Sequence, residues 1–250
     1  MRAADDRAVL DAAQAAAAET GAKAMVPIAG RPFLDHLLHA LAEAGFDDIA
    51  LVLAPEHAQT RAYYTALPVS RIRLSFVTQR EPRGTADAVL AGESWTAGQP
   101  FIALNSDNLY PIPALAALRE ASRPAVPGFE RDSLNLPLDR VATFARIERD
   151  ARGCLSKIVE KPGLEAMRAA GPGALVSMNV WRFDRRIFSA CRDVPLSTRG
   201  EKELPQAVAL AASRGVCFEV LPARGPVVDL SSRADVARVT AELGGADVRL

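Results

Sequence analysis

Apolar residues in this chain follow two patterns, short uninterrupted runs and longer stretches with helical spacing. The runs at residues 49–53 and 101–104 are typical of strands buried on both faces. Phe33, Leu37 and Leu41 recur at helical spacing, between Pro32, which suits a first helical turn, and a closing glycine. Strands that alternate with helices in this way predict an α/β fold, with a mixed Rossmann-like sheet flanked by helices.

The remaining segments extend this prediction over the whole chain. Further strands are expected at residues 72–76, 125–129 within a loop-like stretch 124–137, 141–148, 154–160, 174–183 and 216–221. Further helices are expected at residues 3–20, 56–67, 113–121, 200–214 and 234–243. His36 and His39 lie three apart on the helix after Pro32 and are expected on its solvated face. No internal repeat divides the chain, so residues 1–250 are predicted to form one domain.

A carboxylate follows each of two short apolar runs. Asp107 comes directly after the strand at 101–104, and Asp229 ends the run that begins at Pro226. Ligands of open α/β sheets bind beyond the carboxyl ends of the strands, so acids placed there are candidate metal ligands. The alternative for the first acid is a plain polar turn, with Asp107 or Asn108 capping the next helix.

Three other polar positions are candidates for ligand binding. Gln79 ends a strand, and Gly84-Thr85 leads into a helix, where a flat ligand can approach the backbone. Thr85 could also do no more than cap that helix. Glu160-Lys161 stands at the exit of a predicted hairpin, where it could be a surface ion pair. Asn179 lies in an apolar strand, and a buried amide of this kind needs a polar partner.

Composition narrows the classes of function. The 30 basic and 30 acidic residues balance and form no basic stripe, which argues against a nucleic acid as the main partner. Three widely spaced cysteines without a Cys-x-x-Cys pair indicate neither a disulfide framework nor a thiolate metal site. No segment approaches the roughly 20 apolar residues of a membrane span. We therefore expect a cytoplasmic protein without a membrane partner.

Taken in chain order, these motifs resemble those of the sugar-1-phosphate nucleotidylyltransferases, which make NDP-sugars from an NTP and a sugar phosphate. The resemblance covers nearly the whole chain and implies a GT-A-like nucleotidyltransferase fold. It rests on residues 23–32, Gln79 with 84–86, 104–108, 160–162, 177–179, 200–205 and Asp229.

The resemblance implies that a sugar phosphate oxygen attacks the α-phosphorus of an NTP and releases pyrophosphate, with Mg²⁺ as cofactor. Asp107 and Asp229 are the implied metal ligands, and Lys23 and Lys161 complete the implied catalytic set by neutralising phosphate charge. The implied nucleotide-binding residues are Gln79, Gly84, Thr85 and Asp107. The implied sugar-binding portion lies within about residues 140–205, and the implied sugar-binding residues are Asn108, Glu160, Lys161 and Asn179. A homo-oligomer is compatible with the resemblance.

One departure from the family is clear in the sequence. The family opens with a buried strand and a Gly-x-Gly-Thr-Arg phosphate loop, and this chain begins at about the point where that loop ends. We expect a start codon placed at an internal methionine rather than a truncated relative. Two rival functions remain: a metal-dependent glycosyltransferase, although Asn105 replaces the first acid of its Asp-x-Asp pair, and a catalytically inactive nucleotide- or sugar-binding homologue.

Overall fold

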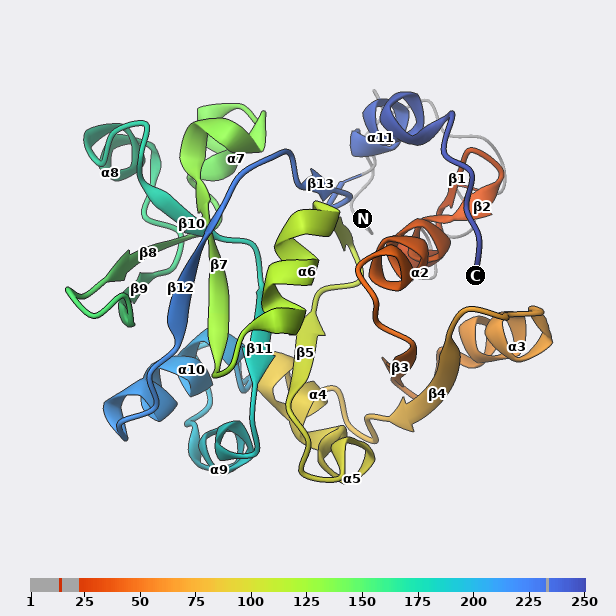
Figure 1. The fold of residues 1–250 in the computed structure, drawn as a ribbon, viewed down its shortest axis with the longest axis horizontal. Helices are drawn as coiled ribbons and strands as arrows, with labels where there is room; N and C mark the ends of the chain where they lie inside the picture. Colours follow the sequence, from red (N-terminus) through yellow and green to blue (C-terminus); the bar gives the residue numbers. More distant parts are fainter. Residues whose placement is uncertain (1–13, 15–22, 233) are drawn as a thin grey trace.

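The computed structural model describes residue 14, residues 23–232 and residues 234–250. The helix expected at residues 3–20 lies outside these residues except for Gln14, which is helical and donates a hydrogen bond to the carbonyl of Pro27. The rest of the chain forms an α/β fold in which helices flank a mixed sheet, as predicted (Figure 1).

Seven strands form the main sheet. Their order is β5 (Phe101–Leu104), β11 (Val180–Phe183), β7 (Ala125–Glu130), β10 (Leu175–Ser177), β8 (Ala145–Arg149) and β9 (Leu155–Val159), with β12 (Glu219–Ala223) paired to β7. The short strand expected at residues 125–129 is therefore present, and it lies at the centre of the sheet. Gly128 is required there because a Cβ atom would lie 2.8 Å from the Val220 side chain of β12.

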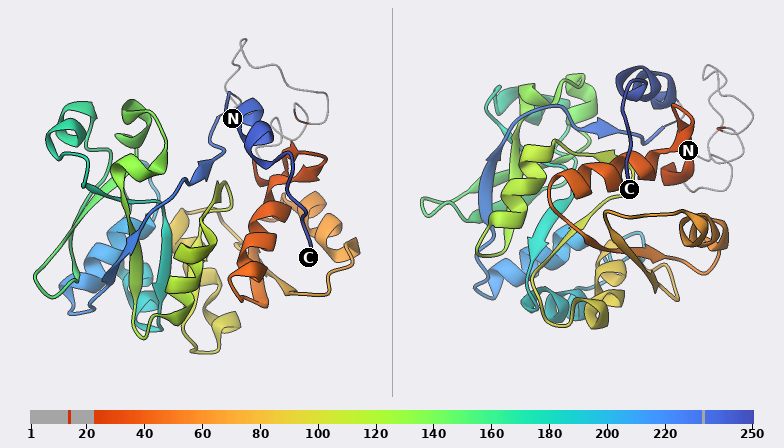
Figure 2. Two further views of the ribbon diagram at one scale, coloured as in Figure 1. Left: turned by 45° about the horizontal axis from the view of Figure 1, so that its top comes forward. Right: turned by 45° about the vertical axis from the view of Figure 1, so that its right-hand side comes forward.

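The described residues also form three two-stranded sheets. They are β1 (Pro27–Ile28) with β2 (Arg31–Pro32), β3 (Asp48–Leu53) with β4 (Arg73–Thr78), and β6 (Asn108–Leu109) with β13 (Val228–Asp229). The parallel β3–β4 pair stands beside the larger sheet, and in the described residues it shares no ladder with β5, whose one sheet neighbour is β11 (Figure 2).

Helices cover both faces of the main sheet. The structure has α2 (Phe33–Glu43), α3 (Ala58–Ala66), α4 (Thr85–Ala91), α5 (Glu93–Thr96), α6 (Ile112–Glu120), α7 (Leu138–Val141), α8 (Leu164–Ala169), α9 (Arg186–Asp193), α10 (Leu204–Ser213), α11 (Asp235–Leu243) and the 3-10 turns η1 (Lys23–Met25) and η2 (Arg131–Leu134). Buried residues of α2 and α6 share one core cluster, and those of α9 and α10 share another. Core clusters therefore lie on both sides of the sheet. The predicted burial of the two apolar runs on both faces is only partly met, because β5 is half-buried along its length and Val52 of β3 is 37% exposed.

The apolar stretch 174–183 is two strands and not the single strand that its composition predicts. Asn179 has a φ of +54°, a left-handed conformation that breaks the strand direction between β10 and β11. Asparagine tolerates this conformation better than most residues because its short amide can bond locally. Asn179 is therefore half-buried at a bend and not inside a strand. Helix α9, which follows, is an element that the apolar pattern does not indicate.

The prediction of a solvated histidine face is wrong for His36. This residue is 4% exposed and its Nε2 lies 3.1 Å from the Ile28 carbonyl oxygen. Burial lowers the pKa of His36 below its usual value, so the ring is held neutral. It ties α2 to the turn between β1 and β2, close in sequence to Lys23. His39 is half-buried and its Nδ1 contacts the backbone of Arg249.

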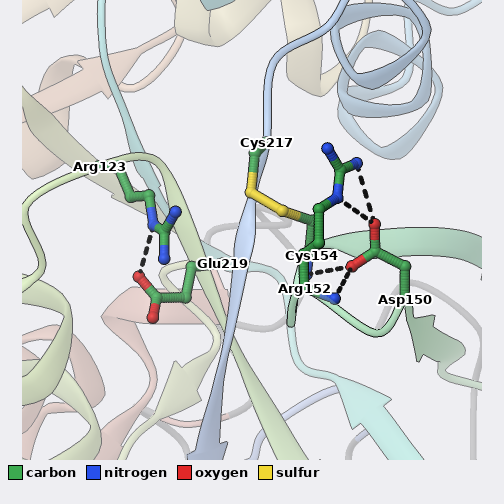
Figure 3. Close-up of a disulfide and its surroundings, with 6 residues drawn as sticks. All are labelled: Arg123, Asp150, Arg152, Cys154, Cys217 and Glu219. Carbon is green, nitrogen blue, oxygen red and sulfur yellow. Dashed lines mark hydrogen bonds and ion pairs between the residues drawn. A yellow bond between two sulfur atoms is a disulfide. The ribbon is translucent and has the colours of Figure 1, made fainter.

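A disulfide joins Cys154 to Cys217, contrary to the sequence expectation (Figure 3). The two residues stand at the starts of β9 and β12, where Leu155 N donates to Phe218 O at 2.8 Å. The carboxylate of Asp150 fixes the adjoining turn by accepting from the backbone N–H groups of Arg152 and Cys154. Their separation of 63 residues gives no hint of this contact, because only strand pairing brings the cysteines together.

Candidate active site

The fold brings the two predicted metal ligands to adjacent strands. Asp229 of β13 pairs in register with Asn108 of β6, and Leu230 N donates to the carbonyl oxygen of Asp107 at 2.9 Å. The two acids come from distant parts of the chain and become neighbours through this short antiparallel ladder. We call Lys23, Asp107, Asn108, Arg140 and Asp229 the acid centre.

Asp229 is buried, being 2% exposed, and both its oxygens are engaged. Arg140 of α7 donates to Oδ2, and the hydroxyl of Ser231 donates to Oδ1. The Asn108 amide, oriented with its nitrogen toward the acid, donates to the same Oδ1 at 3.0 Å. Sequence reasoning did not identify Arg140, since no motif marks it. Asn108 lies buried in a supporting position beside Asp229, and its predicted contact with a sugar stays a prediction.

Asp107 is less enclosed and faces a lysine. Lys23 Nζ, on the 3-10 turn η1, lies 3.6 Å from Asp107 Oδ2. Burial raises the pKa of Asp107 above its usual value; the charge of Lys23 opposes this rise, and the nearby Asp229 carboxylate adds to it. The effect of the Asp229 charge on the pKa of Asp107 agrees with the placement of both carboxylates at one site.

The acid centre has the donor chemistry of a divalent cation site that is completed by substrate. Mg²⁺ in phosphate-transfer sites is held by one or two carboxylates together with phosphate oxygens and water. Asp107 and Asp229 supply the two carboxylates. In the described part of the chain, no cluster of three or more His, Cys, Asp or Glu residues could hold a metal by itself. The residues therefore fit a metal that arrives with a phosphate ligand.

The predicted base-recognition turn is held by its own hydrogen bonds. The Gln79 Nε2 donates to the Gly84 carbonyl at 3.1 Å and to Asp87 Oδ2 at 2.9 Å. Gly84 has a φ of +109°, and a Cβ atom there would lie 2.4 Å from the carbonyl oxygen of Lys202. The need for glycine thus comes from close packing against the 200–205 segment, not only from room for a ligand.

Thr85 does not cap its own helix, which was the alternative considered from the sequence. Gly84 is the N-cap residue of α4, without a side-chain cap bond. The Thr85 Oγ1 instead accepts from the Leu204 N–H at 2.9 Å, at the start of α10. Residues 79–86 and 200–205, two motifs far apart in the sequence, therefore lie side by side.

Three of the predicted sugar-binding residues lie apart from Asn108, namely Glu160, Lys161 and Asn179. We call these three, together with Arg199 and Glu203, the sugar arm. Lys161 and Asn179 are both left-handed, with φ of +45° and +54°. Such residues cost about 1 kcal/mol or more and occur preferentially at functional sites. In the described residues the Asn179 side chain has no hydrogen-bond partner.

Charges gather on the sugar arm around Glu160. Loss of hydration raises the pKa of Glu160, and the Glu203 carboxylate raises it further. Arg199 lies 3.0 Å from Glu203 Oε1 and compensates part of this negative charge. Arg199 is a residue that sequence reasoning missed, and Glu203 appeared only as part of a motif.

Tyr110 links the two groups. Its buried hydroxyl donates to the Met178 carbonyl at 2.9 Å, directly before Asn179. Because Tyr110 follows β6, the bend that presents Asn179 is attached to the strand that presents Asn108. The structure thus places the acid centre and one part of the sugar arm next to each other.

A separate hollow of about 430 Å³ is lined by His39, Glu43, Arg71, Asp247 and Arg249. Its charged groups pair with each other, Arg71 with Glu43 and Arg249 with Asp247. It contains none of the residues predicted from the sequence, and we assign it no function.

Comparison with known proteins decides the family. The profile of the nucleotidyl transferase family matches residues 18–221. The chain belongs to this family. A glucose-1-phosphate thymidylyltransferase of Actinoplanes sp. is 27% identical over 222 residues, covering 86% of this chain and 69% of that protein. The bifunctional protein GlmU of Methanococcus vannielii is 25% identical over 190 residues, covering 76% of this chain and 42% of that protein.

Solved structures of nucleotidyl transferases share the fold. A UDP-glucose pyrophosphorylase from Acinetobacter baumanii superposes with a TM-score of 0.72 at 18% identity, covering 90% of this chain and 87% of that one. The predicted fold is thereby confirmed, and the family match confirms the resemblance to sugar-1-phosphate nucleotidylyltransferases. The chain spans only about two fifths of the length of the GlmU relatives it matches, 42% in the example above.

Proposed function

We propose that this nucleotidyl transferase condenses an NTP with a sugar 1-phosphate, giving an NDP-sugar and pyrophosphate in an Mg²⁺-dependent reaction. The observation that carries the proposal is the acid centre, where Asp107 lies next to the β6–β13 ladder that carries Asp229 and faces Lys23. The relatives named as a thymidylyltransferase and a pyrophosphorylase support it. Neither a glycosyltransferase nor an inactive homologue is favoured by these relatives.

In this proposal, the residues of the chain position reactants and neutralise charge. Asp107 and Asp229 would hold Mg²⁺, which when bound would offset the negative charge of the NTP phosphates. Lys23 would stay beside Asp107 and face the α-phosphate or the departing pyrophosphate. Fixed charges of this kind act mainly by electrostatic stabilisation of phosphoryl-type transition states.

The base-recognition turn and the sugar arm would divide the substrates. Gln79, Gly84 and Thr85 would contact the nucleotide base, with Gln79 offering a donor and an acceptor to a base edge. Lys161 would bind the phosphate of the sugar, while Glu160 and Asn179 would bind its hydroxyl groups. The free amide of Asn179 and the left-handed backbone of both Lys161 and Asn179 support this assignment.

The proposed location is the cytoplasm. Among the described residues, no helix is both long and apolar enough to cross a membrane.

A pyrophosphate-release assay tests the proposal. The purified chain is supplied with Mg²⁺, one of the common NTPs and one of several hexose 1-phosphates, and NDP-sugar is identified by mass spectrometry. Asp107→Asn should abolish release, because the amide is a poor ligand for a hard cation. Asp193→Asn is the matched control, since Asp193 only pairs with Arg214 on the surface. Release that requires no sugar phosphate, or that survives Asp107→Asn, would contradict the proposal.

A further inference from the structure

Each carboxylate of the acid centre already has a positively charged side chain as its partner. Lys23 lies 3.6 Å from Asp107, and Arg140 is bonded directly to Asp229. The Asp229 side chain is 3% exposed, whereas that of Arg140 is 31% exposed. A carboxylate so enclosed requires a cation or several donors to remain charged. Arg140 meets that requirement while no metal is bound.

The two oxygens of Asp229 have different partners. Neutral donors, Ser231 and Asn108, hold Oδ1, and the charged guanidinium of Arg140 holds Oδ2. A divalent cation that binds Asp229 through Oδ2 must take the position of the guanidinium, because two positive charges do not share one carboxylate oxygen cheaply. Arg140 and a metal are therefore alternatives at this oxygen.

The surroundings of Arg140 allow it to leave Asp229. It lies on the four-residue helix α7, and its guanidinium stacks over the Phe144 ring at 5.6 Å. Asp235 Oδ2 lies 3.9 Å from Nη2, so a second carboxylate can receive the guanidinium when Asp229 turns to another cation. Asp235 Oδ2 also accepts from the backbone N–H and the hydroxyl of Ser232, each at 2.8 Å, which holds this second carboxylate in place.

We propose that Arg140 is the resident counter-ion of Asp229, and that it competes with the divalent cation for Asp229 Oδ2 and so sets the metal affinity of the protein without substrate. The proposal rests on the proposed function, since it takes Asp229 as a metal ligand. Arg140 acts through Asp229 and is a positioning residue. Its presence makes metal binding weak until a phosphate ligand contributes further oxygen atoms.

Mn²⁺ binding to the nucleotide-free protein, measured by electron paramagnetic resonance, tests the competition directly. Arg140→Gln should bind Mn²⁺ at least about tenfold more tightly than the wild type, as expected for loss of a close competing charge. Arg140→Lys should stay near the wild type. Arg168→Gln is the charge-matched control, because Arg168 pairs only with Glu165 on the surface, and its affinity should not change. Equal or weaker Mn²⁺ binding by Arg140→Gln would overturn the proposal.

Thermal unfolding provides a second readout that a purely structural role would not produce. Without metal, Arg140→Gln should unfold at a lower temperature than the wild type because Asp229 is left buried and unpaired. Mn²⁺ should raise the midpoint of Arg140→Gln more than that of the wild type or Arg168→Gln. The double variant Arg140→Gln/Asp229→Asn should lose this extra gain. A midpoint that falls without selective recovery in Mn²⁺ assigns Arg140 a structural role and contradicts the proposal.

The two proposals fail in different ways. Tighter Mn²⁺ binding by Arg140→Gln, without pyrophosphate release by the wild type, supports the counter-ion role and contradicts the proposed reaction. Pyrophosphate release by the wild type, with Mn²⁺ affinity unchanged in Arg140→Gln, supports the reaction and contradicts the counter-ion role.

Discussion

The acid centre and the sugar arm are built on opposite principles. In the acid centre, Asp229 is buried with both oxygens bonded, and Asp107 is paired with a lysine. In the sugar arm, Lys161 is exposed and Asn179 is half-buried with a free amide, and both sit in left-handed backbone conformations. The difference indicates that charge is fixed in advance where a phosphate would react, while Lys161 and Asn179, which would meet a variable sugar, have no side-chain hydrogen bond or ion pair in the described residues.

The largest effect is expected from the acid centre itself. Asp229→Asn should lower kcat for NDP-sugar formation roughly a thousandfold, because it removes a charged metal ligand and leaves Arg140 facing a neutral amide. Steady-state rates of pyrophosphate release measure this. A rise in KM for the sugar phosphate with kcat unchanged would instead place Asp229 in substrate binding, and the contrast between the two regions would be lost.

The disulfide offers a way to disturb the sugar arm from a distance. The double variant Cys154→Ser/Cys217→Ser should lose about 2 to 4 kcal/mol of unfolding free energy, measured in urea, because it opens a long covalent loop. Since β9 (Leu155–Val159) connects Cys154 to Glu160, KM for sugar 1-phosphate should rise while Mn²⁺ affinity stays constant. A reductant should not alter the double variant further. A matching change in Mn²⁺ affinity would show that the regions are mechanically coupled.

Two substitutions of Lys161 distinguish the effect of its charge from the effect of its strained backbone in the sugar arm. Lys161→Ala and Lys161→Gly should both reduce kcat/KM for sugar 1-phosphate by about 10- to 100-fold, through loss of a phosphate-binding cation. The glycine variant should be about 1 kcal/mol more stable than the alanine variant, because glycine adopts a φ of +45° without strain. Urea unfolding measures the difference. Lys157→Ala, on the exposed side of β9, is the control and should change neither quantity.

The smallest effect is expected from His36, which contacts the carbonyl of Ile28, close in sequence to Lys23. Burial holds the pKa of His36 below 6.5, so as the pH falls the unfolded chain binds the proton first. The His36 contribution is therefore complete above pH 6.5 and is lost as the pH falls toward the lower pKa of the folded state. Each pH unit between the two pKa values corresponds to about 1.4 kcal/mol.

His36→Gln isolates this contribution, because the amide can still donate to the Ile28 carbonyl but does not titrate. Unfolding free energies at pH 7 and pH 5 should differ less in His36→Gln than in the wild type. His57→Gln is the matched control. An unchanged pH dependence in His36→Gln would show that the ring is not held neutral.

Much of this arrangement could be predicted from the sequence. Short apolar runs that end in a carboxylate locate Asp107 and Asp229, since strand ends of an α/β sheet meet at one edge. Arg140 could not be predicted, because its role depends on how far α7 stands from β13 and no local pattern encodes that distance. The disulfide was missed because the contact between the starts of β9 and β12 is a property of sheet topology.

Local conformation was also beyond the sequence pattern at particular residues. Asn179 turns the chain between two strands, although the composition around it is mostly apolar, because a single left-handed residue leaves the hydrophobic pattern intact. His36 is buried, although polar residues at helical spacing predict a solvated face, because the turn at Ile28 folds over that side of α2. In both cases a tertiary contact decided the outcome.

The disulfide also divides the molecule topologically. The covalent ring from Cys154 to Cys217 encloses Lys161, Asn179 and Glu203, whereas Lys23, Asp107 and Asp229 lie outside it. Leu196, 59% exposed, marks a stretch inside the ring that proteases can reach. After a cut there, the two fragments would stay joined by the disulfide, and the protein would be heavier by one water molecule. A reductant would then separate the fragments. The disulfide would thus keep the fragment that carries Glu203 and Asp229 tethered to the fragment that carries Lys161, Asn179 and Asp107.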